Sequence, residues 1–159
     1  MAKNDITLLL SLLDEAFERK TWHGTNLRGS LRGLTAEEAA WRPSIRRHNI
    51  WEIAVHCAYW KYTVRRRLLN EKRGSFPLKG SNWFKRPETL GEDAWKEDLH
   101  LLTETHRSLR DAVSNFPLAK LYSTTAQSKY PNIFVIYGIA NHDIYHAGQI
   151  QLLKRLQQE

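Results

Sequence analysis

Two histidines four residues apart, His142 and His146, stand near the end of the sequence. On an α-helix four residues turn the chain by about 400°, so the two rings lie on one face a single turn apart. Imidazole nitrogens at this spacing can bind one metal ion together. The pair therefore predicts part of a metal site.

The pair belongs to a longer stripe whose members recur at spacings of four and three residues, which is typical of the inward face of a helix in a bundle. The stripe contains Val135, Ile139, His142, His146, Gln149, Leu153 and Leu156. A buried polar group without a partner costs about 1 to 3 kcal/mol, so the two histidines and the glutamine indicate a function. Gln149 either orients a ligand imidazole or bound water, or forms a hydrogen bond between helices.

His56 is the best candidate for a third ligand. It is flanked at helical spacing by Ile53, Trp60 and Thr63, so its ring can face the interior of a bundle. Three histidines leave coordination positions open for water or substrate, which is typical of catalytic sites rather than closed structural ones. We expect Trp60 to belong to the core or to a pocket wall.

The other histidines are weaker candidates. His106 lies on the predicted inward face of a different helix, where we favour a core histidine over a partner of the metal site. His48 stands beside a helix start, His100 is off the inward face, and His23 lies in a stretch of broken helical pattern.

Helical periodicity dominates the chain, because its apolar residues follow a 3.6-residue period and do not alternate as in strands. Asn49 is a predicted N-cap, with Glu52 completing a capping box, and Pro117 ends another helix. We expect one all-α domain, residues 1–159, folded as a four-helix bundle with long connecting loops. The predicted helical segments are residues 6–20 with a continuation at 26–34, 49–71, 90–116 and 133–157.

Two connections, residues 72–89 and 117–132, are too long for tight turns. At about 3.3 Å per residue the first can span the roughly 30 Å length of a bundle, so the helices it joins need not be antiparallel. It contains Phe76, Trp83 and Phe84, which we expect to cap an open end of the bundle.

The net charge of +7 is concentrated in residues 42–73, which hold nine basic and two acidic residues, while the rest of the chain is balanced. Such a segment attracts an anion, which can be a nucleic acid, an acidic membrane surface or a small substrate with carboxylates. Alternatively, Arg65, Arg66 and Arg67 form the solvated end of a helix, where they complement its dipole.

Other features narrow the class of protein. No apolar run approaches the roughly 18 to 20 residues of a membrane span, and the first residues do not resemble a secretory signal. Cys57 is the single cysteine, so an intrachain disulfide and a cysteine zinc cluster are excluded. We expect a cytoplasmic protein whose metal ligands come from His, Asp, Glu and water.

Three segments resemble the DinB-like (damage-inducible DinB/YfiT) superfamily of bacterial four-helix-bundle metalloenzymes, which is distinct from the DNA polymerase of similar name. They are residues 142–150 (HDIYHAGQI), 49–56 (NIWEIAVH) and 33–43 (GLTAEEAAWRP). The resemblance covers nearly the whole chain. It implies a divalent ion, which is zinc, nickel or manganese, held by His56, His142 and His146. Relatives include thiol S-transferases, maleylpyruvate isomerase-like enzymes and members without known activity, and no further residue selects one branch.

A metal held by three neutral imidazoles keeps its positive charge and lowers the pKa of a bound thiol or water. We therefore expect an enzyme similar to the thiol S-transferases, acting on a small anionic or thiol substrate, with a metal-dependent hydrolase as the alternative. We also expect a homodimer, formed through a remaining apolar face.

Two rival functions are disfavoured. The segment 142–146 (HDIYH) differs by one residue from the HExxH motif of zinc peptidases, but Asp143 is a methylene shorter than the glutamate base, and we expect Asp143 and Tyr145 to point away from the metal. No downstream ligand is present either. A basic nucleic-acid-binding helical protein is the non-enzyme alternative, and it leaves the histidines unexplained.

Overall fold

The computed structural model describes residues 2–124 and 127–158, and these residues are largely helical. Apart from an isolated bridge between Thr124 and Pro131, they contain no β-structure. The all-α prediction is therefore confirmed. The α-helices in the described ranges are α1 (Ala2–Phe17), α2 (Leu27–Leu31), α3 (Ala36–Ala40), α4 (Ile50–Leu68), α5 (Gly91–Ser114) and α6 (Asn132–Leu156).

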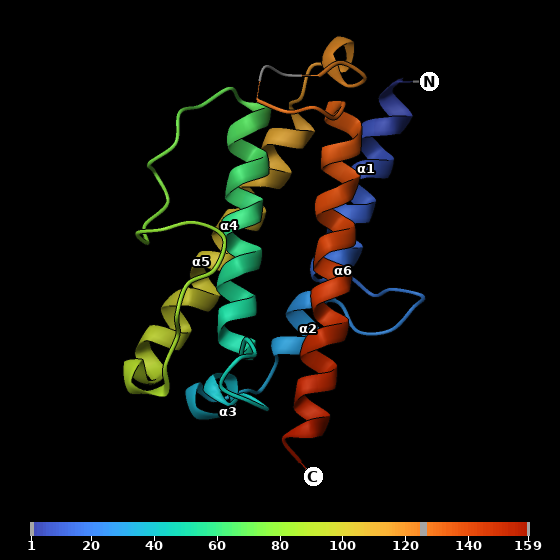
Figure 1. The fold of residues 1–159 in the computed structure, drawn as a ribbon. Coiled ribbons are helices and arrows are strands. Elements are labelled where there is room, and N and C mark those ends of the chain that lie inside the picture. Colours follow the sequence, from blue (N-terminus) through green and yellow to red (C-terminus); the bar gives the residue numbers. More distant parts are fainter. Residues whose placement is uncertain (1, 125–126, 159) are drawn as a thin grey trace.

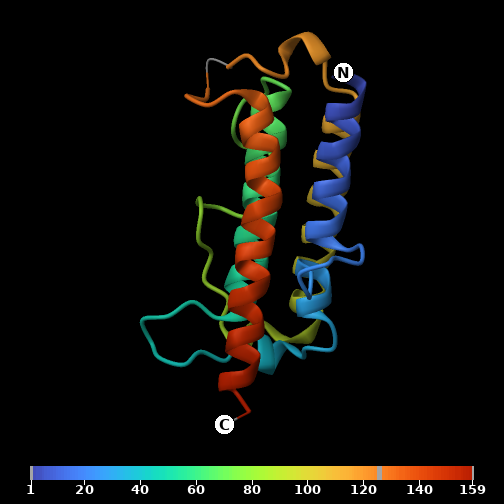
Figure 2. The ribbon, with the colours of Figure 1, turned by 90° about the vertical axis from the view of Figure 1, so that its right-hand side faces the viewer.

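The four long helices pack along one another. Helix α4 contacts α5 and α6, and α1 contacts the same two helices from the opposite side. In Figure 1, α1 and α6 descend while α4 and α5 ascend. Figure 2 shows α6 in front of α4 and α1 in front of α5. Two short helices complete the fold. Helix α2 packs against α6, and α3 packs against α4 and α5.

Helices α4 and α5 are parallel neighbours, so the chain between them must return along the length of the bundle (Figure 1). The returning loop lies against the side of α4. Phe84 is buried there, Phe76 packs edge-on against Tyr59 at 5.3 Å, and Trp83 stacks on His56. These aromatics therefore cover a side of the bundle, and the expectation that they cap an open end is wrong.

Local sequence signals set where α4 begins and ends. The Asn49 side chain accepts a hydrogen bond from the Glu52 amide at 2.7 Å, and the Glu52 carboxylate accepts one from the Asn49 amide, so the predicted capping box is present. The helix ends at Leu68, before Asn70 takes a positive φ of 55°. Asparagine is among the few residues that tolerate this conformation.

The buried apolar residues form two clusters. One joins the first half of α4 to α2, α3 and the start of α5, and the other joins the second half of α4 to α1, the end of α5 and the start of α6. Lys61 on α4 and Asp143 on α6 lie between the clusters and are fully buried. No helix in the described residues has an apolar run long enough to cross a membrane.

Candidate metal centre

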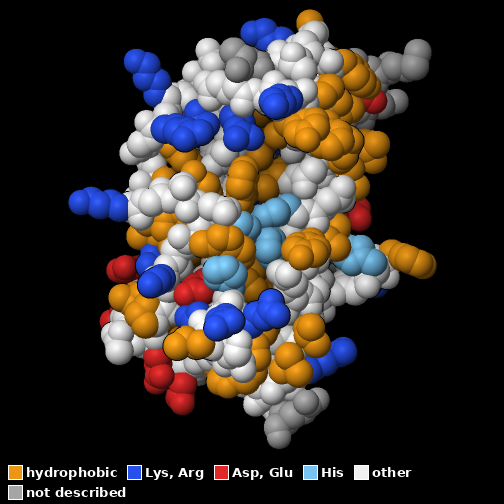
Figure 3. Space-filling view, viewed as in Figure 1, with side chains coloured by type: hydrophobic (Ala, Val, Ile, Leu, Met, Phe, Trp, Pro, Cys, Tyr) orange, Lys and Arg blue, Asp and Glu red, His pale blue; other side chains and the backbone are white. Residues whose placement is uncertain are grey.

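Three histidines from two helices meet at the α4–α6 interface. The Nε2 atom of His142 lies 3.1 Å from Nε2 of His56 and 3.2 Å from Nε2 of His146. His56 and His146 are buried, and His142 is half-buried. Histidine side chains gather near the middle of the face seen in Figure 3, so the cluster borders the surface. The three candidate ligands thus form one compact group that can hold a metal ion.

Hydrogen bonds fix which nitrogen is free in two of the three rings. Nδ1 of His56 donates to the backbone carbonyl of Asn82 at 2.8 Å, and Nδ1 of His146 donates to Oε1 of Gln149 at 2.7 Å. The Gln149 amide nitrogen donates in turn to the Tyr145 hydroxyl at 3.0 Å. In a neutral imidazole the other nitrogen then carries a lone pair. Nε2 of both rings therefore presents a lone pair to the same point.

This arrangement fits a metal ion. A proton on Nε2 of His142 can satisfy only one of the two lone pairs facing it, whereas a cation attracts the lone pairs of His56, His142 and His146 at once. The donor set is three neutral nitrogens, which suits zinc, nickel and other first-row divalent ions better than calcium or magnesium.

Burial keeps the three rings neutral. The pKa of His56 is lowered to about 4 and the pKa of His142 to about 3, mainly by burial and to a smaller extent by electrostatic repulsion from His146. Burial also lowers the pKa of His146. The neutral form, which is the one that binds a metal, is therefore already present at physiological pH.

The loop between α4 and α5 holds His56 in place. The Trp83 indole stacks on the His56 ring with centres 3.8 Å apart and planes 8° from parallel. Trp83 also stacks on the exposed His48 at 3.6 Å. Its neighbour Asn82 has a positive φ of 66°, and its side-chain oxygen accepts a hydrogen bond from the Trp60 indole at 2.9 Å. Sequence reasoning missed both loop contacts.

Asp143, which we expected to point away from the metal, faces the interior of the bundle. It is fully buried, and its Oδ2 accepts a hydrogen bond from the Lys61 ammonium. Oδ1 of Asp143 and Nδ1 of His142 are both buried without a partner. A sequence signal for the burial of Asp143 exists, because Asp143 recurs at helical spacing with apolar residues. Together they form the most buried stripe of α6, which contains Ile136, Ala140, Asp143, Ala147 and Ile150.

The Lys61–Asp143 ion pair favours the three-histidine group over a second possible metal site. Cys57, His142 and Asp143 form a second group of closely spaced metal-binding atoms. The Lys61 ammonium occupies the carboxylate of that group, so a second cation there would meet a like charge. The same pairing leaves Asp143 unable to act as the general base that the zinc-peptidase interpretation requires.

The remaining histidines lie apart from the cluster. His106 stacks on Phe17 at 3.9 Å, both its ring nitrogens are buried without a partner, and burial lowers its pKa to about 2. His48 binds the Glu52 carboxylate at 3.0 Å, and His23 and His100 are exposed.

Two cavities flank the cluster. An apolar cavity of about 420 Å³ reaches His146 and Gln149 and is walled by Ile53, Leu152 and Leu153. A second cavity of about 570 Å³ borders Trp60 and Asn82, which both contact the cluster. Volumes of roughly 300 to 1,000 Å³ are usual for small-molecule sites. The first cavity therefore reaches the histidine cluster at His146, and the second ends at Trp60 and Asn82 beside the cluster.

Comparison with known proteins is consistent with this geometry. The sequence profile of the DinB superfamily matches residues 19–150. Searches of curated proteins and of solved structures give no significant match. Because the matched residues make up most of the chain and include all three histidines, the chain belongs to the DinB superfamily.

Proposed function

We propose that this protein is a divalent-metal-dependent enzyme that transfers a small thiol to an electrophile. The observation that carries the proposal is the convergence of the three Nε2 atoms, two of which present lone pairs to one point. Membership of the DinB superfamily supports the same reading. The proposed metal is zinc, nickel or manganese.

His56, His142 and His146 would hold the ion, which when bound supplies positive charge that lowers the pKa of a thiol or water. The protein's own groups position the rings. The Asn82 carbonyl fixes the tautomer of His56, and Gln149 fixes that of His146. Trp83 covers one face of His56 and keeps water from it. We assign Gln149 the role of orienting a ligand imidazole.

The two cavities support a reaction with two reactants. The one beside His146 is lined by Leu152, Leu153 and Leu156 and suits an apolar electrophile. The other carries several cationic side chains and suits an anionic thiol. In the proposed reaction the thiol proton passes to solvent, a sulfur–carbon bond forms, and the electrophile either loses a leaving group or takes up a proton at the adjacent atom.

The experiment begins with protein purified without a histidine tag, whose metal content is measured by elemental analysis. Metal-free protein is then reloaded with zinc, nickel or manganese and incubated with low-molecular-weight thiols and an alkyl or epoxide electrophile. We expect one metal equivalent and a thioether product, detected by mass spectrometry, that metal-free protein does not form. Equal product from metal-free protein would contradict the proposal.

Other outcomes identify the alternatives. Metal-dependent cleavage of ester or amide substrates without a thiol would indicate the hydrolase. Tight binding of duplex DNA that survives physiological salt, without either activity, would indicate the nucleic-acid-binding protein.

We further propose that the enzyme is a cytoplasmic homodimer. Leu8 and Leu12 on α1 are four residues apart and 60% and 39% exposed, and burying apolar surface of this kind favours association. Light scattering on the purified protein tests the oligomeric state, and a monomer at all concentrations would contradict it.

A further inference from the structure

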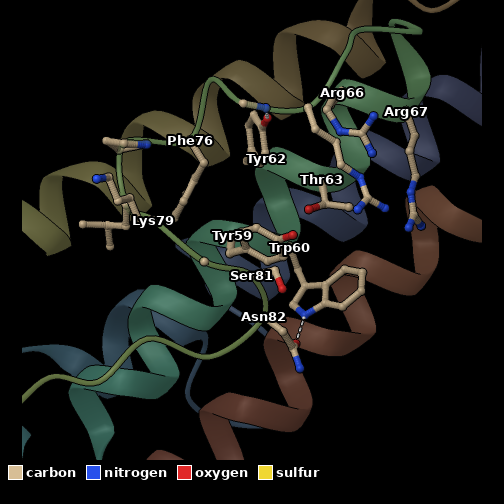
Figure 4. A pocket seen from close by; sticks show the side chains of 15 residues that line it. Tyr59, Trp60, Tyr62, Thr63, Arg66, Arg67, Phe76, Lys79, Ser81 and Asn82 are labelled. Carbon is tan, nitrogen blue, oxygen red and sulfur yellow. Dashed lines mark hydrogen bonds between the residues drawn. The ribbon is translucent and has the colours of Figure 1, made fainter.

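The larger cavity is strongly basic (Figure 4). It lies between α4 and the loop that follows it. Figure 4 shows Arg66 and Arg67 at one end, Phe76 and Lys79 at the other, and Trp60 and Asn82 between them on one side. The described residues that line it include four cationic side chains and no acidic one. The cationic residues are Arg66, Arg67, Arg73 and Lys79. A concave surface of this charge favours an anionic ligand.

Arg67 differs from the two arginines before it. Arg65 forms a bidentate ion pair with Glu71 at 2.7 and 3.1 Å, and Arg66 donates to the Glu71 carbonyl and the Gln127 side chain. Arg67 has no hydrogen-bond acceptor among the described residues, and its buried Nε is unpartnered. Its guanidinium carbon lies 5.9 Å from the centre of the Trp60 ring.

The surroundings of Arg67 leave its charge uncompensated. Burial lowers its pKa, and the nearby positive charges of Arg66 and Arg73 lower it further. A guanidinium stays protonated in proteins, so Arg67 keeps its positive charge and would stabilise an anion bound beside it. The cavity thus holds a fixed positive charge without an acidic partner.

Thr63 provides a second polar group without a hydrogen-bond partner. Its side chain is 5% exposed, and Oγ1 is buried without a hydrogen-bond partner although it lines the cavity. Thr63 and Arg67 are four residues apart on α4 and therefore share one helical face. A hydroxyl and a guanidinium on the same wall are suitable donors for the oxygens of a carboxylate or phosphate.

The same face of α4 leads to the metal centre. His56, Trp60, Thr63 and Arg67 follow one another at spacings of four, three and four residues. The Trp60 ring lies edge-on to His56 with centres 6.3 Å apart. Asn82 links the two, because its carbonyl holds His56 and its side chain holds Trp60. A small molecule bound at Arg67 can extend along Trp60 toward the histidines.

We propose that this cavity binds the carboxylate or phosphate group of the substrate between Arg67 and Thr63, and thereby directs the rest of the molecule toward the three histidines. The identification of that molecule as the thiol rests on the proposed function. Binding of the oxyanion itself does not, so the two can be tested separately.

The binding test uses inorganic phosphate and succinate as probes, titrated into metal-free and zinc-loaded protein. The indole N–H resonance of Trp60 reports binding by NMR. We expect saturable shifts in both forms of the protein, because the subsite does not include the ion. A response to phosphate but not succinate would mean that the oxyanion is a phosphate, and the reverse would mean a carboxylate.

Arg67→Gln and Arg65→Gln form a matched pair of variants, since each removes one charge from the same helical turn and only Arg67 lines the cavity. We expect Arg67→Gln to weaken probe binding ten- to hundredfold and Arg65→Gln to change it less than twofold. Equal weakening in both variants would overturn the proposal, as would the absence of any Trp60 response in the wild type.

Thr63→Val keeps the side-chain volume and removes the hydroxyl, so it tests the second donor if Arg67→Gln is poorly folded. We expect three- to tenfold weaker probe binding. If the protein shows transferase activity, its kinetics give a further test. We expect Arg67→Gln to raise KM for the anionic thiol at least tenfold and to leave KM for the neutral ester of that thiol unchanged. Probe binding without transferase activity would contradict the proposed function while supporting the oxyanion subsite.

Discussion

Trp83 lies flat against His56, with ring centres 3.8 Å apart, so a loop residue forms one wall of a site whose candidate ligands come from helices. The residue before it, Asn82, accepts the Nδ1 hydrogen bond of the same histidine. The long connection between α4 and α5 therefore sets both the tautomer and the ring plane of His56.

Removing a ligand should weaken metal binding strongly. We expect His56→Ala to lower zinc affinity at least a hundredfold in competition with a chromogenic chelator, because only His142 and His146 then remain. His100→Ala is the control, since His100 is exposed and lies outside the cluster. If His56→Ala retains full stoichiometry and affinity, the proposed ligand set is wrong.

Gln149 should strengthen metal binding without being a ligand itself. Gln149→Leu removes the acceptor for Nδ1 of His146, and we expect a ten- to hundredfold loss of zinc affinity at unchanged stoichiometry. Gln151→Leu, the same substitution two residues along α6, is the control. Unchanged affinity in Gln149→Leu would show that its hydrogen bond is incidental.

Metal removal should abolish activity and cost only part of the stability. The two apolar clusters on either side of the polar layer hold the bundle together independently of the ion. At a metal concentration about a hundred times Kd, the bound state gains about 2.7 kcal/mol, so EDTA should lower Tm by roughly 5 to 10 °C. Cooperative unfolding on EDTA treatment at room temperature, followed by circular dichroism, would instead mark the metal as structural.

Removing one partner of the buried Lys61–Asp143 ion pair should destabilise the protein more than removing both partners. Lys61→Met leaves the Asp143 carboxylate buried without its partner, and we expect a loss of about 3 to 5 kcal/mol in urea unfolding of the metal-free protein. The double variant Lys61→Met with Asp143→Leu removes both charges and should recover most of that loss. A double variant as unstable as Lys61→Met alone would mean that the lost stability comes from packing.

His106 should make the protein sensitive to acid. Its pKa is about 2 in the folded state because of burial, while the unfolded chain titrates near the ordinary histidine value of about 6.5. Protons therefore bind the unfolded state first, and the stability that is fully present above pH 6.5 falls as the pH decreases. Between pH 7.5 and pH 5 this amounts to about 2 kcal/mol.

The variant His106→Leu removes that titration. In urea unfolding of the metal-free protein at both pH values, it should lose about 2 kcal/mol less than the wild type over the same interval. The exposed His100→Leu is the control and should lose as much as the wild type. An unchanged pH dependence in His106→Leu would show that His106 is not held neutral by the fold.

The sequence by itself determined what depends on neighbours along the chain. Helical periodicity predicted the long helices, and the capping box of Asn49 and Glu52 located the start of α4. A spacing of four residues placed His142 and His146 on one face, because the geometry of a helix is the same in every protein. Helical spacing also made His56 the best candidate for a third ligand, and the family pattern implied the same residue.

Only the tertiary structure decided which faces meet. The axial shift and rotation of α4 against α6 bring Nε2 of His56 within 3.1 Å of His142 and pair Lys61 with Asp143, and neither quantity is encoded in the periodicity of a single helix. The predicted stripe on α6 was correspondingly inexact, since Leu156 is 39% exposed. The path of the loop, which carries Trp83 to His56, depends on contacts between residues far apart in sequence, and local propensities do not fix such contacts.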